Sequence, residues 1–300
     1  MDLWRTALDP WGRKVLVGIS WNLMWAVIVL SVVFVAAHAV WARVRGVAAA
    51  AAEEAGGAVS GAESGLARSV PERVLRHGAS ARAFHWIMAL VMFALLFTAF
   101  LPGVGIRFAW VAPHWIAGVL LLLVVAYHAV HATVWQDWRS MWIGRRDVRE
   151  GAAELRRAFS RSTPAPPRSG KYPVDHKVYH HVTALVSLAA IATGLLMMVR
   201  VETPFRVRNP YLLSDEAWGI VYVVHGLSGV ALIALVAAHV YFAVRPEKRW
   251  MTWAMIRGWI RREEYLAHHD PALWVPEPEG GLAPGPAVEP VMLSDSGTDE

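Results

Sequence analysis

The stretch that decides the fold is AWGIVYVVHGLSGVALIALVAAHVYFAV, residues Ala217 to Val244. It contains no Asp, Glu, Lys or Arg, and it exceeds the roughly 20 apolar residues that a helix needs to cross a bilayer. His225 and His239 lie about 21 Å apart along such a helix and only about 40° apart around it. Imidazoles inside a membrane span are costly and usually functional, and two at this spacing suit two stacked haems.

The composition of the 300-residue chain narrows the possible chemistry. The chain is 56% hydrophobic, which is typical of a membrane protein with several spans. It has no cysteine, which excludes disulfides, iron–sulfur clusters, thiolate metal sites and covalent c-type haem within this chain. The net charge of +5 does not indicate nucleic acid, because the basic residues lie in loops beside apolar runs. Any redox centre must be held by histidine or methionine.

Four other uncharged runs predict further membrane helices, at 15–42, 84–101, 111–135 and 178–199. We expect an all-α membrane protein, a four-helix dihaem bundle with one extra N-terminal transmembrane helix. The expected divisions are an N-terminal transmembrane helix (1–42), a polar connector (43–75), a dihaem four-helix domain (76–275) and a disordered acidic, Pro-rich tail (276–300). A signal peptide is the alternative for the first run, which ends in a cleavage-like Ala37-His38-Ala39, but the run is long for a signal core.

The segments between the predicted spans lie alternately on the two sides of the membrane. Those on one side carry 22 Lys and Arg residues, and those on the other side carry 7. Cytoplasmic loops carry the excess of these residues, so we expect the N-terminus outside and the C-terminus in the cytoplasm. The expected location is a bacterial inner membrane. In this orientation His239 lies near the cytoplasmic (inner) face and His225 near the outer face.

Two haems with two axial ligands each need two more histidines. His85 begins a span that runs outward, and His114 begins one that runs inward, so their depths match His239 and His225. Gly118 and Gly229 each follow a predicted outer ligand by four residues, where a glycine lets a flat macrocycle approach the backbone. His128 repeats the same spacing after His114, and spacing alone does not separate it from His85. The roles of His128, His131 and the extra helix stay open.

From about residue 76 to 274, the chain resembles the γ subunit of membrane-bound formate dehydrogenase, a dihaem cytochrome b. The resemblance is carried by six short motifs. They are an early His-Trp (His85, Trp86), two His-x-x-x-Gly motifs (His114 and Gly118; His225 and Gly229), a Gly-Lys-Tyr (Gly170, Lys171, Tyr172), an x-His-x-Tyr (His239, Tyr241) and a final His-His-Asp-Pro-…-Trp (His268, His269, Pro271, Trp274). It implies that His85 pairs with His239 and His114 with His225 as haem-iron ligands. It also implies an electron-transfer subunit that has no dehydrogenase activity alone.

In that family, an iron–sulfur subunit outside the membrane and a molybdenum or tungsten catalytic subunit supply electrons, which cross two b haems to a quinone near the cytoplasmic face. The resemblance implies a quinone pocket near the Gly-Lys-Tyr motif, and we expect the quinone, menaquinone or ubiquinone, to bind near Tyr172, Asp175 and His176, polar residues at the start of a predicted helix. This chain has Pro173 and His176 where the family has Asn and Gln, so the pocket is expected in the same position with altered chemistry.

Two other function classes remain at this stage. The same kind of cytochrome could serve a nickel–iron hydrogenase or a thiosulfate-reductase-type complex, or the chain could be a haem-free membrane scaffold or transporter. The sequence leaves the partner, the quinone type, the direction of electron flow and the oligomeric state open, because the catalytic chemistry belongs to other chains.

Overall fold

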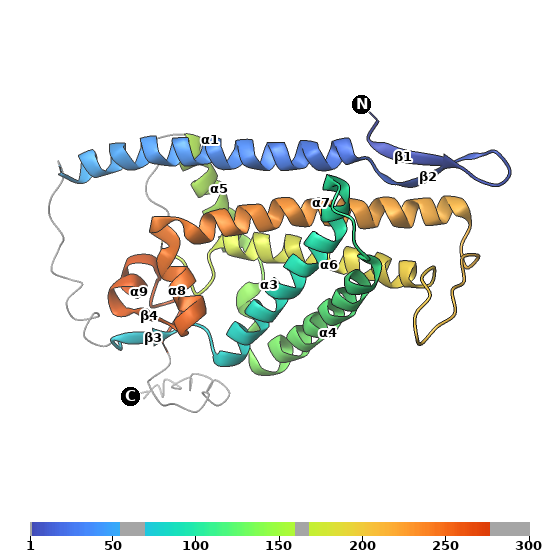
Figure 1. Cartoon of the computed structure of the whole chain (residues 1–300). Coiled ribbons are helices and arrows are strands. Elements are labelled where there is room, and N and C mark those ends of the chain that lie inside the picture. Colours follow the sequence, from blue (N-terminus) through green and yellow to red (C-terminus); the bar gives the residue numbers. More distant parts are fainter. Residues whose placement is uncertain (1, 55–69, 160–167, 277–300) are drawn as a thin grey trace, which may run out of the picture.

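The computed structural model describes residues 2–54, 70–159 and 168–276 (Figure 1). Within these residues, five helices are long and apolar enough to cross a membrane. They are α1 (Trp21–Glu54), α3 (Ala79–Phe100), α4 (Val111–Trp135), α6 (Val174–Met198) and α7 (Asp215–Val244). The predicted all-α membrane architecture is therefore confirmed. Ser214 is the N-cap residue of α7, and its hydroxyl accepts a hydrogen bond from Ala217 N (3.3 Å).

The first uncharged run is not helical throughout, and the prediction of a helix from residue 15 is wrong. Strands β1 (Trp4–Leu8) and β2 (Lys14–Ile19) form an antiparallel hairpin, and α1 begins only at Trp21. The Val15-Leu16-Val17 segment suits a strand, because β-branched side chains fit a pleated surface. β2 lies against α7, where a Cβ on Gly219 would be 2.8 Å from the Leu16 carbonyl oxygen. The absence of a side chain at Gly219 thus permits this close contact.

The membrane helices pack in pairs: α3 against α4 and α6 against α7, with α1 along α7 (Figure 1). Buried residues from three of these helices meet in one apolar cluster. They are Val91, Met92, Ala117, Leu121 and Leu232. Between α3 and α4, the chain turns through the short 3-10 helix η1 (Leu101–Val104). This packing brings histidines from separate helices together.

The segment predicted as a loop between α4 and α6 contains η2 (Trp138–Met141) and the amphipathic helix α5 (Arg145–Phe159). After α7 come η3 (Pro246–Lys248), α8 (Arg249–Arg257), β4 (Trp259–Arg261) and α9 (Arg262–His268). Residues 277–300 of the predicted tail lie outside the described residues, as do residues 55–69 of the predicted connector.

A small folded cap closes one end of the bundle. Strand β3 (Arg73–Leu75) pairs with β4, and Figure 1 shows both beside α8 and α9, at the end of the molecule opposite the β1–β2 hairpin. Its apolar core consists of Val70, Val74, Ala254, Ile260 and Tyr265. The cap connects directly to the start of α3 and the end of α7, the two helix ends that carry His85 and His239.

Candidate functional site

The helix packing brings His85 of α3 close to His239 of α7. Their ring centroids lie 6.1 Å apart, with an angle of 49° between the ring planes. Tyr179 of α6 stacks on the His239 ring at 5.4 Å. We call His85 and His239 the inner pair, because the pair lies at the cap end of the bundle. Tyr179 is a neighbour that the sequence analysis did not identify.

A second pair lies further along α7. His114, at the start of α4, faces His225 of α7 with ring centroids 6.2 Å apart and an interplanar angle of 80°. We call these two residues the outer pair. The two pairs join the same residues that were matched by depth and by the family resemblance.

These separations agree with two imidazoles on one metal ion. An imidazole nitrogen binds a metal at about 2 Å and the ring centre lies roughly 1 Å behind it, so two ligands in line place their ring centres about 6 Å apart. His85 Nδ1 is buried without a hydrogen-bond partner in the described structure. At Gly118, a Cβ would meet no atom within 4 Å, which leaves space beside the outer pair. These features fit bound haem.

A third pair has a similar separation. His128 of α4 and His180 of α6 have ring centroids 6.2 Å apart, and Phe84 stacks on the His128 ring at 4.1 Å. The structure therefore does not bring His128 to His239, as the alternative pairing from spacing would require. Exposure separates only the outer pair from the other two: His114 and His225 are both half-buried, whereas His180 of the third pair and His239 of the inner pair are exposed. Ring separation alone would not have selected two pairs out of three.

The Nδ1 atoms of the outer pair are hydrogen-bonded to threonines. His114 Nδ1 lies 2.9 Å from Thr98 Oγ1 of α3, and His225 Nδ1 lies 2.9 Å from Thr193 Oγ1 of α6. All four helices of the bundle thus contribute to the outer pair. Neither threonine was identified from the sequence, because residues sixteen and thirty-two positions from a histidine carry no local signal.

An apolar hollow of about 460 Å³ lies between α5, α6 and α7 beside Tyr179, and Asp175 and Glu154 contribute to its wall. Its other lining residues are Gly151, Val174, Val178, Val182 and Leu235. Partial removal from water and the nearby Asp175 carboxylate raise the pKa of Glu154 above its usual value. Of the three predicted quinone residues, Asp175 lines this hollow, whereas Tyr172 and His176 are not among its lining residues. Burial raises the pKa of Tyr172.

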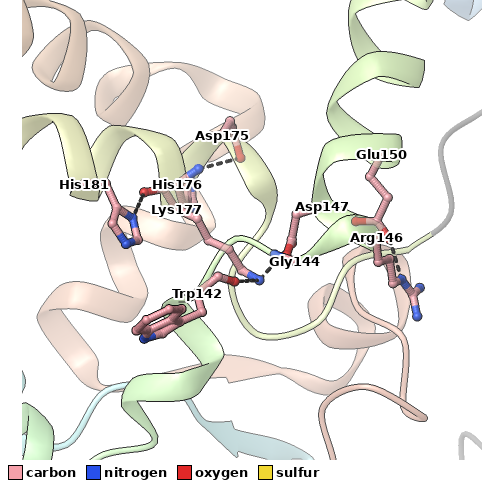
Figure 2. Close-up of polar contacts among 9 residues, drawn as sticks. All are labelled: Trp142, Gly144, Arg146, Asp147, Glu150, Asp175, His176, Lys177 and His181. Carbon is pink, nitrogen blue, oxygen red and sulfur yellow. Dashed lines mark hydrogen bonds and ion pairs between the residues drawn. The ribbon is translucent and has the colours of Figure 1, made fainter.

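Helix α5 is attached to the start of α6 by polar contacts, which Figure 2 shows. Lys177 Nζ forms an ion pair with Asp147 Oδ1 (2.8 Å) and donates to the Trp142 carbonyl oxygen (3.1 Å). Asp147 Oδ2 also accepts from Gly144 N (2.8 Å). These bonds hold one wall of the hollow. Burial is the largest single effect on the Asp147 carboxyl and would raise its pKa, but the contacts with Lys177 and Gly144 together outweigh it, so the pKa of Asp147 is lowered.

In the cap, residues from the beginning and the end of the stretch that resembles the formate dehydrogenase subunit contact each other. Arg76 is 4% exposed and donates to His269 Nε2 (2.9 Å) and to the Lys171 carbonyl oxygen (2.9 Å). His269 Nδ1 then donates to the Gly170 carbonyl oxygen (2.8 Å). Because Nε2 accepts from a guanidinium, His269 is neutral here. Burial and, secondarily, Arg76 lower the pKa of His269 to about 4, and that of His77 to about 3.

The other membrane histidines contact neighbours outside the inner and outer pairs. His38 of α1 is hydrogen-bonded to Tyr241 OH (2.9 Å), and His131 stacks with Tyr127 at 5.6 Å. His181 Nδ1 lies 2.8 Å from the Lys177 carbonyl oxygen, four residues earlier in α6 (Figure 2).

Two comparisons with known proteins agree with the resemblance to formate dehydrogenase cytochrome b subunits. The chain is 23% identical over 215 residues to the formate dehydrogenase cytochrome b556 subunit of Haemophilus influenzae, an alignment that covers 66% of this chain and 81% of that protein. Residues 76–258 match the family described as prokaryotic cytochrome b561. Because this match spans more than half of the chain, the protein belongs to the prokaryotic cytochrome b561 family, whose members are multi-pass membrane proteins that carry b-type haem.

Proposed function

We propose that this chain is the membrane-anchoring dihaem cytochrome b subunit of a formate dehydrogenase-like complex. In this role it passes electrons from an iron–sulfur subunit on the outer side of the membrane to quinone near the cytoplasmic face. The observation that carries the proposal is the presence of two histidine pairs that each take one member from α7, with ring separations of 6.1 and 6.2 Å. The relative named a formate dehydrogenase subunit supports the type of complex.

In this proposal His85 and His239 hold the inner haem, and His114 and His225 hold the outer haem. Haem iron, when bound, supplies a one-electron redox centre at each pair. The helices hold the two rings of each pair at ligand distance. The apolar cluster that includes Val91 and Leu121 excludes water from the space between the two pairs. Gly118 leaves the backbone accessible to a flat group at the outer pair, whereas a Cβ on Gly229 would contact the Phe100 ring (3.5 Å).

The hollow beside Tyr179 supports a quinone site near the inner pair. Its wall is apolar, as an isoprenoid-substituted ring requires, and its carboxylates offer protons for a quinone that takes two electrons. We propose that Asp175 lines this site and that His176 and Tyr172 supply protons from the adjoining start of α6. The raised pKa of Glu154 adds a further proton donor at the rim.

The proposed topology has the N-terminus outside and the cap in the cytoplasm, in a bacterial inner membrane. The uneven loop charges support this orientation. The partners are an iron–sulfur subunit and a molybdenum or tungsten catalytic subunit. The divisions at residues 42, 75 and 275 stay predictions.

Purification of the tagged chain from membranes of its own host tests the proposal. We expect a reduced-minus-oxidised spectrum with b-type haem bands and co-purification of an iron–sulfur subunit with a formate-oxidising subunit. Co-purification with a hydrogenase or a thiosulfate reductase instead would contradict the type of complex. A colourless chain from cells supplied with haem would contradict the cytochrome function itself.

A further inference from the structure

The hydrogen bonds of Thr98 and Thr193 determine which ring nitrogen of each outer histidine is protonated. Thr98 Oγ1 lies 2.7 Å from the Ala94 carbonyl oxygen of its own helix, and Thr193 Oγ1 lies 2.6 Å from that of Ala189. A carbonyl oxygen can only accept, so each hydroxyl donates its single proton to its own helix. The hydroxyl oxygen can then only accept from the histidine.

It follows that Nδ1–H is the donor in both His114 and His225. The Nε2 atom of each ring is therefore unprotonated and free to bind a metal. A metal-bound histidine that donates its other N–H is held in one orientation and becomes a stronger electron donor. The two bonds at the outer pair therefore both increase the electron donation from the histidine ligands to the metal.

The inner pair differs in this respect. His85 Nδ1 is buried without a hydrogen-bond partner among the described residues, and His239 stacks against Tyr179. A ligand without this hydrogen bond donates less electron density to iron. The two pairs, with similar ring separations, therefore differ in the partners of their Nδ1 atoms.

We propose that Thr98 and Thr193 are positioning residues that lower the redox potential of the outer haem through the Nδ1 atoms of His114 and His225. A more strongly donating ligand favours the ferric state, so the outer haem lies below the inner haem in potential. Electrons that enter on the outer side then move to a centre of higher potential. This inference rests on the proposed function, because it requires haem at both pairs.

The test compares valine and serine at each position in the haem-loaded full chain. Valine has the shape of threonine without the hydroxyl, and serine retains the hydroxyl. The midpoint potential of each haem is measured by redox potentiometry, with the low-spin electron paramagnetic resonance signals recorded in parallel. The haem that is lost in His114→Ala identifies the outer component.

We expect Thr98→Val and Thr193→Val each to raise the potential of the outer haem, their combination to raise it further, and the inner haem to keep its potential. The serine variants should return the outer haem toward the wild-type value. Thr133→Val is the matched control, because Thr133 Oγ1 makes the same bonds to its own helix (2.9 and 3.0 Å) and contacts neither pair. Loss of the outer haem in the valine variants and its retention in the serine variants would also support the role of the hydroxyl.

The inference is overturned if both valine variants keep the wild-type potential, if both haems shift equally, or if serine has the same effect as valine, including loss of the haem in both. In each of these results the wild-type chain holds two haems and the proposed function stands. A wild-type chain with fewer than two haems overturns the proposed function together with the inference.

Discussion

Single residues near the inner pair carry the proposed proton delivery to quinone. Asp175 lines the hollow beside Tyr179, and the His176 backbone N–H donates to Asp175 Oδ1 (2.9 Å; Figure 2). His176→Ala removes a titratable ring next to the hollow but no proposed haem ligand. We expect quinone reduction to slow about tenfold or more, in line with the loss of one general acid, while the haem spectrum stays as in the wild type.

The matched control for this variant is His181→Ala, whose exposed ring contacts the Lys177 carbonyl oxygen and not the hollow. It should reduce quinone at the wild-type rate. Steady-state reduction of a soluble quinone analogue and the reduced haem spectrum are measured on the same samples. A collapse of the haem spectrum in His176→Ala would show that this residue has a structural or ligand role and would refute its role in proton delivery.

The contact between Arg76 and His269 makes the stability of the cap depend on pH. His269 has a pKa of about 4 in the folded chain, against about 6.5 for an unperturbed histidine. The folded state therefore resists protonation, and its stability is complete above about pH 6.5 and falls as the pH drops toward 4. The contribution is at most about 3.5 kcal/mol, since each pKa unit corresponds to about 1.4 kcal/mol.

Thermal unfolding of the detergent-solubilised chain at several pH values checks this prediction. The wild type should lose stability between about pH 7 and 5. His269→Gln should be less stable at pH 7 and should lose less between the two values, whereas the exposed-ring variant His181→Gln should follow the wild type. An unchanged pH dependence in His269→Gln would mean that other groups cause the loss; His77, with its lowered pKa, acts in the same direction.

At the scale of elements, the sequence predicts the membrane helices well and the rest poorly. The α4 run, residues 111–135, was predicted with its observed bounds, because a run without charges is a strong signal in a chain that must satisfy its backbone in lipid. Strand β2 was missed, since a short apolar run reads the same in a strand and in the start of a helix. The β3–β4 pair joins strands of three residues about 185 positions apart, which no local pattern reveals.

The same limit applies to the candidate site. Depth and motif matched His85 to His239 and His114 to His225, and the structure brings the same rings together. Thr98, Thr193 and Tyr179 could not be found, because their contacts depend on how four helices pack and not on neighbouring residues. Asp175 and His176 were found by position, but only Asp175 contributes to the wall of the hollow.

The attachment of α5 to α6 is the element that a single substitution tests best. The Lys177–Asp147 pair is mostly buried, with side-chain exposures of 12% and 14%, so removal of one partner leaves the other without compensation. Lys177→Met should loosen α5 and increase its amide hydrogen exchange about tenfold or more, from a local loss of about 1–3 kcal/mol. Hydrogen-exchange mass spectrometry on the purified chain provides the measurement.

Arg146→Gln is the control, because its ion pair with Glu150 lies within α5, its second ion pair, with Asp270, is long (3.9 Å), and Arg146 is 46% exposed. Such pairs contribute less than about 1 kcal/mol, so exchange in α5 should change little. Equal exchange in Lys177→Met and the wild type would show that α5 is held by its apolar face and not by this ion pair.

At the scale of the whole molecule, the central claim is that one long helix, α7, contributes a ligand to each of two haems. His225 and His239 lie on this helix, and their partners come from α4 and α3. In the proposed function, this arrangement puts one haem near each end of the membrane span. The cap lies at the end with the inner pair, the proposed quinone hollow and the start of α6, so electrons and protons would meet at one end of the bundle.

The most direct test is the ratio of haem to protein in three double variants of the purified chain. We predict that the wild type binds two haems, that His85→Ala/His239→Ala and His114→Ala/His225→Ala each keep one, and that the two retained haems differ in midpoint potential. His128→Ala/His180→Ala should keep both. The account is contradicted if either of the first two double variants retains both haems, or if the His128→Ala/His180→Ala variant loses one.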